Sequence, residues 1–276
     1  MKILLTGKDG QVGFELQRSL APLGEIVAVD LADCDLSDAQ AIRQLVATVL
    51  PDIIVNPAAY TAVDKAESDQ ERAAAVNAIA PGIFGEEAAK LGALVVHYST
   101  DYVFDGTKDG AYCEADSTNP QSVYGRTKRD GELALANTNP RHLILRTSWV
   151  VGAHGGNFAK TMLKLAADRD SLNVVADQWG VPTSAALLAD IAAHLVRQQR
   201  SNPEAFPYGT YHCVAGGETK ILHPGDAIAE SVGVLHNGRN IGDEPVKIVA
   251  FFTGEVGNKI SIAHPEFAPP PSSGSE

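Results

Sequence analysis

Short apolar segments alternate with segments of helical periodicity along the first 150 residues of the chain. The apolar segments are rich in Val, Ile and Leu, and they span residues 2–6, 25–30, 52–58, 94–100 and 142–148. Runs of this length and composition predict strands that are buried on both faces. Residues 37–50 and 123–137 carry apolar side chains at helical spacing and predict helices between the strands. The alternation predicts an α/β fold with a doubly wound parallel sheet.

A few residues mark the expected helix ends. Ser37 is expected to cap the helix that Pro51 ends. Ser68 and Glu71 have the spacing of a capping box for the next helix, which Pro81 is expected to interrupt. Gly92 is expected to end that helix, because glycine adopts the left-handed conformation of a C-terminal cap easily.

The alternation of apolar and helix-periodic segments ends at about residue 150. Residues 157–169 predict a helix, and a second helix carries Leu187, Leu188, Ile191 and Leu195 on one face. From about residue 220 to residue 262 the pattern is β-like, with a strand expected at 246–253. The last residues, 268–276, are rich in Pro and Ser, which is typical of disorder.

Composition narrows the possible functions. The formal net charge of the 276 residues is -12, which argues against a nucleic-acid partner. Three cysteines stand far apart, which is typical of reduced thiols and not of a disulfide framework. The N-terminal apolar run is too short for a signal peptide, and no segment nears the ~20 apolar residues of a membrane span. We therefore expect a cytoplasmic protein that does not bind membranes.

A glycine-rich turn follows the first predicted strand. Gly7, Gly10 and Gly13 have the spacing GxxGxxG and open the first helix. Such a turn lets the backbone approach a pyrophosphate and points helix amides at it, which is typical of a Rossmann-like dinucleotide site. The spacing also occurs by chance, and a turn without ligand is the alternative. Asp30 ends the second strand, where a carboxylate accepts hydrogen bonds from the adenosine ribose and favours NADH; NADPH would need a compensating cation.

Tyr124 and Lys128 predict reductase chemistry. They lie four residues apart on a predicted helix, so both side chains emerge on one face. A ketone that accepts hydride needs a proton, and an adjacent ammonium together with an oxidised nicotinamide can make a tyrosine acidic enough to supply it. Lys128 would also hold the nicotinamide ribose. Thr100, at the end of the preceding strand, offers a hydroxyl to the substrate carbonyl. A solvated helix face is the alternative interpretation of the pair.

Longer motifs resemble the dTDP-4-dehydrorhamnose reductase family, within the extended short-chain dehydrogenase/reductase superfamily. The resemblance covers about residues 1–217 and rests on the segments 61–67, 97–104, 123–128, 146–150, 157–162 and 177–183. It implies NADH- or NADPH-dependent reduction of the C4 ketone of dTDP-4-dehydro-L-rhamnose, a dTDP-linked keto-sugar, to dTDP-L-rhamnose for surface polysaccharide.

The resemblance also assigns residues. It implies a cofactor site formed by Gly7, Gly10, Gln11, Val12, Gly13, Asp30, Asp35, Leu36, Ala59, Tyr60, Thr61, Tyr98, Tyr124 and Lys128. It implies substrate contacts from Thr100, Asp101 and Trp149, with Tyr124 as the proton donor. Similar enzymes form magnesium-bridged homodimers through glutamates; Glu15 is present here but Ala186 occupies a second position. A homodimer is one possibility that the sequence leaves open, and a magnesium ion is not expected.

The C-terminal part departs from this pattern. Residues 225–240 resemble the second motif of a cupin barrel, but they supply only His236 where a metal site needs several ligands, so we interpret His236 as structural. We expect an NAD(P)-binding Rossmann domain at 1–150, a truncated sugar-nucleotide-binding region at 151–217, a β-rich cupin-like segment at 218–262 and a disordered tail at 263–276. This C-terminus is expected to leave cofactor binding intact and to reduce sugar affinity and activity.

Three alternatives remain open. The same scaffold carries nucleotide-sugar epimerases and dehydratases, which retain NAD and regenerate it in each cycle. Similar folds also serve as non-catalytic cofactor-binding regulatory subunits, against which the Tyr124–Lys128 pair argues. A third possibility gives the C-terminal segment its own role in binding sugar or metal.

Overall fold

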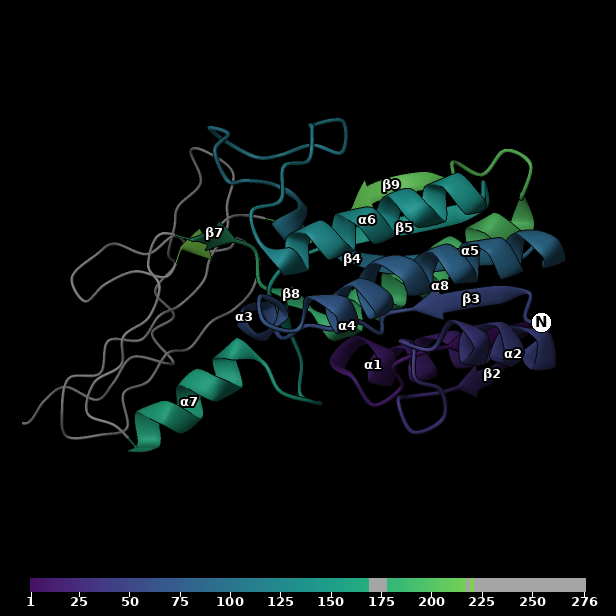
Figure 1. The fold of residues 1–276 in the computed structure, drawn as a ribbon, viewed down its shortest axis with the longest axis horizontal. Helices are drawn as coiled ribbons and strands as arrows, with labels where there is room; N and C mark the ends of the chain where they lie inside the picture. Colours follow the sequence, from purple (N-terminus) through teal and green to yellow (C-terminus); the bar gives the residue numbers. More distant parts are fainter. Residues whose placement is uncertain (169–177, 217–218, 221–276) are drawn as a thin grey trace, which may run out of the picture. The chain divides into compact units, whose positions relative to one another are not determined.

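The computed structural model describes residues 1–168, 178–216 and 219–220 (Figure 1). The predicted cupin-like segment, its strand at 246–253, His236 and the tail at 263–276 lie outside the described residues. The described residues fall into two units, one formed by 1–168 with 182–214 and the other including 178–181, 215–216 and 219–220.

A parallel sheet of six strands forms the centre of the first unit. Its order is β2 (Glu25–Ala28), β1 (Lys2–Leu5), β3 (Ile53–Asn56), β4 (Leu94–Thr100), β5 (His142–Thr147) and β9 (Gly209–His212). Every pair of neighbours is parallel. The five predicted strands are confirmed. The sheet extends past residue 150, where the sequence analysis placed the end of the domain, because one more helical crossover after β5 returns the chain to pair as β9.

Helices cover both faces of the sheet (Figure 1). On one face α1 (Gln11–Leu20) and α8 (Ala185–Ser201) bury a core that includes Ile3 and Leu5. On the other, α2 (Ala39–Val49), α5 (Ala80–Leu91) and α6 (Val123–Thr138) bury a core that includes Leu4. Adjacent residues of β1 thus enter opposite cores, as the pleat of a strand requires. The predicted doubly wound Rossmann-like fold is confirmed.

Shorter elements complete the described chain. The first unit also contains η1 (Ala21–Leu23), α3 (Val63–Ala66), α4 (Gln70–Ala74), η2 (Ala75–Ile79), η3 (Asp101–Val103) and α7 (Phe158–Asp168). Two of its strands, β6 (Val150–Val151) and β8 (Thr183–Ser184), pair in parallel. In the second unit β7 (Trp179–Gly180) and β10 (Thr219–Lys220) pair antiparallel.

Two predicted helix caps are wrong. The carboxylate of Asp38, not Ser37, caps α2 by accepting from the backbone amides of Gln40 and Ala41 at 2.8 and 3.1 Å. The Ser37 hydroxyl instead donates to Asp35. No capping box forms at α4, because the Ser68 hydroxyl donates to the Lys65 carbonyl. Gly92 does end α5, with φ of 66°.

Pro81 does not interrupt its helix as predicted. The chain passes from α4 through the π turn η2 into α5, and the Ala80 amide donates to the carbonyl of Ala75. Proline has no N–H for the carbonyl four residues earlier, which belongs to Asn77, and a π turn relieves the resulting clash. That carbonyl lies against α6, where a Cβ on Gly131 would be 2.0 Å from it.

Within the described parts of the chain, helices are too short or too polar to span a membrane.

Candidate active site

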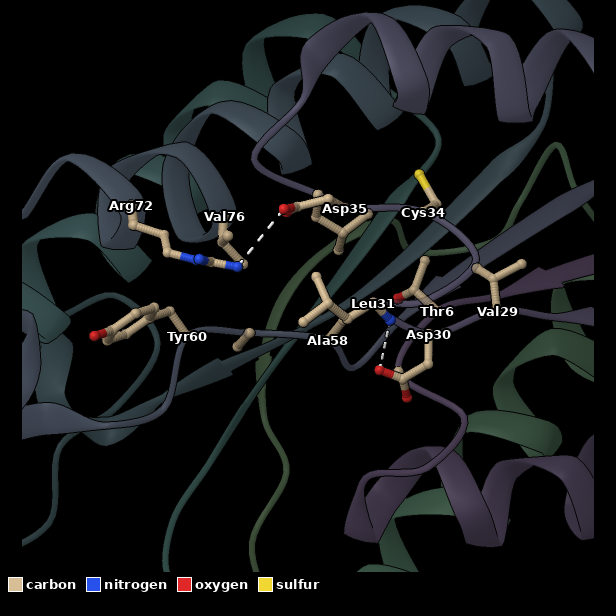
Figure 2. A pocket seen from close by; sticks show the side chains of 13 residues that line it. Thr6, Val29, Asp30, Leu31, Cys34, Asp35, Ala58, Tyr60, Arg72 and Val76 are labelled. Atoms are coloured by element: carbon tan, nitrogen blue, oxygen red, sulfur yellow. Dashed lines mark hydrogen bonds and ion pairs between the residues drawn. The ribbon is translucent and has the colours of Figure 1, made fainter. Parts of the chain in front are cut away.

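A cavity of about 260 Å³ opens at the carboxyl ends of β1, β2 and β3 (Figure 2). Strand β1 has β2 on one side and β3 on the other, so the strand order reverses there, which is where doubly wound sheets bind ligands. The cavity is lined by six of the predicted cofactor residues, namely Gly7, Asp30, Asp35, Leu36, Ala59 and Tyr60.

The glycine turn has the geometry that a pyrophosphate site needs. Gly7 adopts a φ of 60°, and a Cβ added to it would lie 3.1 Å from Ala58. A Cβ on Gly13 would lie 1.9 Å from the Gly7 carbonyl oxygen, so only glycine allows α1 to start against the turn. The first amides of α1, from Gln11 onward, have no acceptor within the helix. The residues present therefore fit a dinucleotide phosphate.

Asp30 stabilises this turn as well as facing the cavity. Its carboxylate accepts from the backbone amides of Asp9 at 2.9 Å and Leu31 at 2.7 Å. Nearby, Lys8 forms an ion pair with Asp33, whose carboxylate also accepts from the Asp30 amide. The predicted ribose carboxylate thus lies beside a lysine that the sequence analysis did not assign.

A second cation, not predicted from the sequence, lines the cavity. Arg72 of α4 lies 3.6 Å from the carboxylate of Asp35, across the cavity from Asp30 (Figure 2). Its side chain is about half exposed. The sequence did not indicate that Arg72 lies near Asp35, because α4 and the loop after β2 come together only when the sheet is assembled. The compensating cation that NADPH would need is therefore available in principle.

The other predicted cofactor residues have different surroundings. The Gln11 side chain accepts from Asn157 at 3.0 Å, so it contacts the loop that precedes α7. Val12 packs against the core between α1 and the sheet, which leaves its backbone amide for a ligand. Thr61 is exposed and does not line the cavity.

Tyr124 and Thr100 are brought together as predicted. Tyr124 lies in the first turn of α6, and the hydroxyl of Thr100, the last residue of β4, is close enough to lower the pKa of the Tyr124 phenol. Thr100 also donates to the Asp101 carboxylate at 3.0 Å and caps η3 by accepting from the Tyr102 amide. The chain thus places a phenol, a hydroxyl and a carboxyl group at one strand end.

The protein's own groups do not make Tyr124 acidic. Burial raises the pKa of Tyr124 to about 12, although the Thr100 hydroxyl opposes this effect. Burial also raises the pKa of Asp101. The sequence analysis expected Lys128 to help lower the pKa of Tyr124, but the ammonium points elsewhere.

Lys128 is almost completely buried, with 2% of its surface exposed. Its Nζ donates to the carbonyl oxygen of Tyr98 at 2.6 Å and lies 3.3 Å from Nε2 of His97. Burial lowers the pKa of Lys128 to about 8, while the charge of Glu132 opposes that shift. Glu132 in turn is held by Arg146 through two hydrogen bonds, of 2.9 and 2.7 Å.

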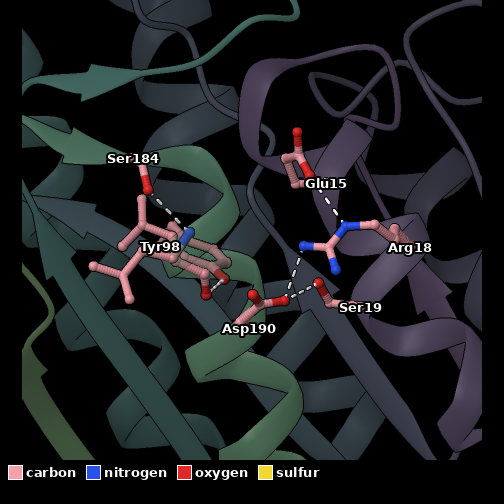
Figure 3. Close-up of polar contacts among 8 residues, drawn as sticks. Glu15, Arg18, Ser19, Tyr98, Ser184 and Asp190 are labelled. Carbon is pink, nitrogen blue, oxygen red and sulfur yellow. Dashed lines mark hydrogen bonds and ion pairs between the residues drawn. The ribbon is translucent and has the colours of Figure 1, made fainter.

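Tyr98 contributes its backbone and not its ring. The ring belongs to the core beneath α8, where the hydroxyl donates to the Leu188 carbonyl at 3.0 Å (Figure 3). Alternation along β4 places the side chain of Tyr98 opposite that of His97, which faces α6. The resemblance places Tyr98 in the cofactor site, and in this arrangement its ring is directed away from α6 and toward α8.

Asn77 is a second residue that the sequence analysis missed. It is 1% exposed, and its amide accepts from the Tyr60 backbone N–H at 2.8 Å and donates to the Tyr60 carbonyl at 3.0 Å. The π turn before Pro81 sets its position, so the proline inside a predicted helix was the available signal.

Trp149 follows β5 in a left-handed conformation with a φ of 42°. Such a conformation is unfavourable for a tryptophan and is found mostly where a site requires it. The Trp149 carbonyl accepts from the Thr183 amide at 3.2 Å, which holds the residue in place.

Glu15, the glutamate associated with magnesium in the sequence analysis, contacts Arg18 (Figure 3). The distance between the Arg18 Nε and the Glu15 carboxylate is 3.4 Å. Arg18 also pairs with Asp190 of α8 at 2.9 Å, and Asp190 accepts from Ser19 at 2.5 Å.

Comparisons with known proteins identify the family. The model of the family described as RmlD substrate binding domain matches residues 1–250, which is further than the resemblance found up to residue 217. The chain is 53% identical to a dTDP-4-dehydrorhamnose reductase of Salmonella typhimurium over 79% of this chain and 74% of that protein.

Solved structures agree with this result. A dTDP-4-dehydrorhamnose reductase of Clostridium acetobutylicum superposes with a TM-score of 0.73 at 40% identity, covering 79% of this chain and 75% of the other. One from Bacillus anthracis, in complex with NADP, superposes with a TM-score of 0.72 at 36% identity and the same coverage. The chain belongs to the dTDP-4-dehydrorhamnose reductase family.

Proposed function

We propose that this chain uses NAD(P)H to reduce the C4 ketone of dTDP-4-dehydro-L-rhamnose, giving dTDP-L-rhamnose. The observation that carries the proposal is that the phenol of Tyr124 and the hydroxyl of Thr100 lie close together at the carboxyl end of β4. Thr100 ends β4 on the side of the sheet where the carboxyl ends of the parallel strands lie, and the cavity beside the glycine turn opens on that same side. Family membership adds the substrate, because the relatives are dTDP-4-dehydrorhamnose reductases.

Tyr124 is proposed as the proton donor. NAD(P)H supplies the hydride when it is bound, and the ketone oxygen then needs a proton. A pKa of about 12 keeps the Tyr124 phenol protonated at neutral pH but makes it a weak acid. A positive charge near the phenol would lower its pKa. Lys128, four residues along α6, directs its ammonium to the Tyr98 carbonyl and His97, so its proposed part is to hold the nicotinamide ribose beside the phenol and not to acidify Tyr124 by direct contact. Thr100 orients the phenol, and Asp101 and Trp149 are proposed to contact the sugar.

The glycine turn and Asp30 are proposed to hold the cofactor. The amides at the start of α1 would bind the pyrophosphate, and the Asp30 carboxylate would accept from the adenosine ribose. Lys8 and Arg72 offset the negative charge of Asp30, Asp33 and Asp35. This balance supports the use of either NADH or NADPH, and the relative from Bacillus anthracis is in complex with NADP.

The test is nicotinamide oxidation with enzymatically prepared dTDP-4-dehydro-L-rhamnose. The full chain should consume one NADH or NADPH for each keto-sugar reduced, whereas an epimerase or a dehydratase would regenerate its cofactor. Tyr124→Phe should lose at least ~100-fold in kcat, the range for removing a general acid. Tyr208→Phe is the matched control, because the Tyr208 hydroxyl contacts Pro203 and Gln199, outside the proposed site. Absence of oxidation that depends on the keto-sugar would refute the proposal.

A further inference from the structure

A chain of buried polar side chains leads from Lys128 toward the cofactor cavity. The Lys128 Nζ lies 3.3 Å from His97 Nε2, and His97 Nδ1 lies 3.1 Å from the side-chain amide of Asn56. The hydroxyl of Thr6 lies 2.6 Å from the same amide group. Thr6, Asn56 and His97 are each 1% exposed. Thr6 precedes Gly7 and lines the cavity.

The three side chains form a row across the sheet. Thr6 follows β1, Asn56 ends β3, and His97 of β4 is the register partner of Asn56. The row ends at α6, which supplies Lys128. Polar groups buried at this depth are costly unless each donor faces an acceptor, so the protons along the row must be ordered.

The charge of Lys128 determines that order. An ammonium has three donors and no acceptor, so it requires an unprotonated Nε2 on His97. A neutral imidazole then carries its proton on Nδ1, which must donate to the carbonyl oxygen of Asn56. The amide nitrogen of Asn56 would then donate to the Thr6 hydroxyl oxygen.

The heavy-atom positions correspond to the opposite order. The Asn56 amide nitrogen faces His97 Nδ1, and the Thr6 hydroxyl donates to the Asn56 carbonyl oxygen. With a neutral His97, this order makes Nδ1 the acceptor and puts the ring proton on Nε2, which in turn requires Lys128 to accept as a neutral amine. A half-turn of the Asn56 amide and a change of the His97 tautomer convert one order into the other. The Thr6 hydroxyl suits both because it can donate or accept.

We propose that His97 is a positioning residue for Lys128, and that its tautomer, with the Asn56 amide, switches as Lys128 gains or loses its proton. The inference rests on the proposed function only in giving Lys128 its part in the reduction. In the charged order, the His97 lone pair stabilises and orients the ammonium that is proposed to hold the nicotinamide ribose. The switch therefore links the state of Lys128 to the Thr6 end of the cofactor cavity.

Other groups around Lys128 do not replace His97. The charge of Glu132, on the same helix, raises the pKa of Lys128, but its carboxylate pairs with Arg146 of β5 at 2.7 Å and does not contact His97 or Asn56. From η2, Asn77 reaches Thr127 and is neutral. From η3, the Asp101 carboxylate is engaged by Thr100. Burial and the charge of Lys128 hold the pKa of His97 well below its usual range, so the imidazole remains neutral while Lys128 titrates.

The direct test is NMR of the wild-type chain labelled with ¹⁵N-histidine, recorded from about pH 6 to about pH 10. The chain has eight histidines, and the signals of His97 are assigned as those lost in His97→Gln. We expect the His97 proton to move from Nδ1 to Nε2 as pH rises, and to stay on one nitrogen in Lys128→Met. A single tautomer over this range in the wild-type chain, or the same switch in Lys128→Met, would overturn the proposal. This readout does not require turnover, so it can fail while the proposed function stands.

Kinetics provide the second test. His97→Leu removes the acceptor for the ammonium, so the pKa of Lys128 falls and the alkaline limb of kcat/KM should move to lower pH by about one unit. At about pH 8, where Lys128 is about half protonated in the wild-type chain, a one-unit fall in its pKa should lower the protonated fraction, and with it kcat/KM, by about 5-fold. His97→Gln keeps an acceptor and should restore most of the activity and the limb.

Asn139→Ala is the control for a merely structural role. Asn139 is also 1% exposed and donates to the Ala93 carbonyl at 3.1 Å, outside the row described above. The Asn139→Ala variant should have a lower melting temperature, while the alkaline limb of its kcat/KM profile should stay where it is in the wild-type chain. An unchanged limb in folded His97→Leu, or equal losses in His97→Leu and His97→Gln, would count against the proposal.

Discussion

Gly13 offers the sharpest test of the glycine turn. A methyl group at this position would lie 1.9 Å from the Gly7 carbonyl oxygen and 2.7 Å from the Gly7 carbonyl carbon. Ordinary contact begins at 3.4 Å, so the Gly7 carbonyl would have to move by about 1.5 Å, the difference between 3.4 and 1.9 Å. The obstacle is backbone, which cannot rotate away like a side chain.

The displacement has a consequence for binding. The Gly7 carbonyl also accepts from the Gly10 amide at 3.0 Å, and moving it breaks the bond that shapes the turn. Overpacking of this kind costs about 1–3 kcal/mol. If the cost falls on the cofactor-bound turn, Gly13→Ala should raise the Kd for NADH by about 5- to 150-fold, because about 1.4 kcal/mol is tenfold in affinity.

The assay is fluorescence titration of NADH against the wild-type chain and two variants, with a melting curve for each. Gly156→Ala is the matched control, because no atom lies within 4 Å of the position its Cβ would take. It should bind NADH within about 2-fold of the wild-type chain, in line with an unstrained surface substitution. Wild-type NADH affinity in folded Gly13→Ala would refute the assignment of this turn to the pyrophosphate.

The cap of α2, the side chain of Arg72 and the C-terminal segment each give a further prediction. Asp38→Ala should lower the free energy of unfolding by about 1 kcal/mol because α2 loses its cap, whereas Ser37→Ala should have a smaller effect; urea denaturation measures both, and the reverse ranking would show that the cap is misassigned. Arg72→Gln should raise the KM for NADPH by ~10-fold and leave that for NADH nearly unchanged, because a 2′-phosphate beside Asp30 and Asp35 loses its cation. If Arg72→Gln raised the KM for NADH and for NADPH equally, Arg72 would not bind the 2′-phosphate of NADPH. If the chain departs from the family pattern after residue 217, as the sequence analysis expected, NADH binding should be normal and the KM for the keto-sugar raised; turnover equal to that of the Salmonella typhimurium relative would contradict this expectation.

Much of the fold was predictable because it follows from local pattern. Each central strand is buried on both faces, so it appears in the sequence as a continuous apolar run, and the five predicted strands formed. The helices between them showed their buried face through helical spacing. Caps were less predictable, because Ser37 and Asp38 are adjacent and either side chain can cap; the backbone path decided for Asp38.

The chemistry of the site was predictable where it depends on spacing within one element. Tyr124 and Lys128 are four residues apart on α6, and Thr100 ends the strand before it, so their order along the chain predicted that Tyr124 and Thr100 lie close together. The direction in which each side chain points was not predictable. Lys128 turns to the carbonyl of Tyr98 and to His97, and the ring of Tyr98 turns to α8.

The sequence by itself determined the doubly wound sheet, the glycine turn and the pair on α6, since these depend on residue type and short spacing. The tertiary structure alone decided which distant residues meet. Thr6 and Asn56 are 50 residues apart and Asn56 and His97 are 41 apart, yet strand order and register place them in one buried row. Arg72 reaches the cavity for the same reason. Local pattern reports which face of an element is buried, whereas the partner on that face depends on how the whole sheet is assembled.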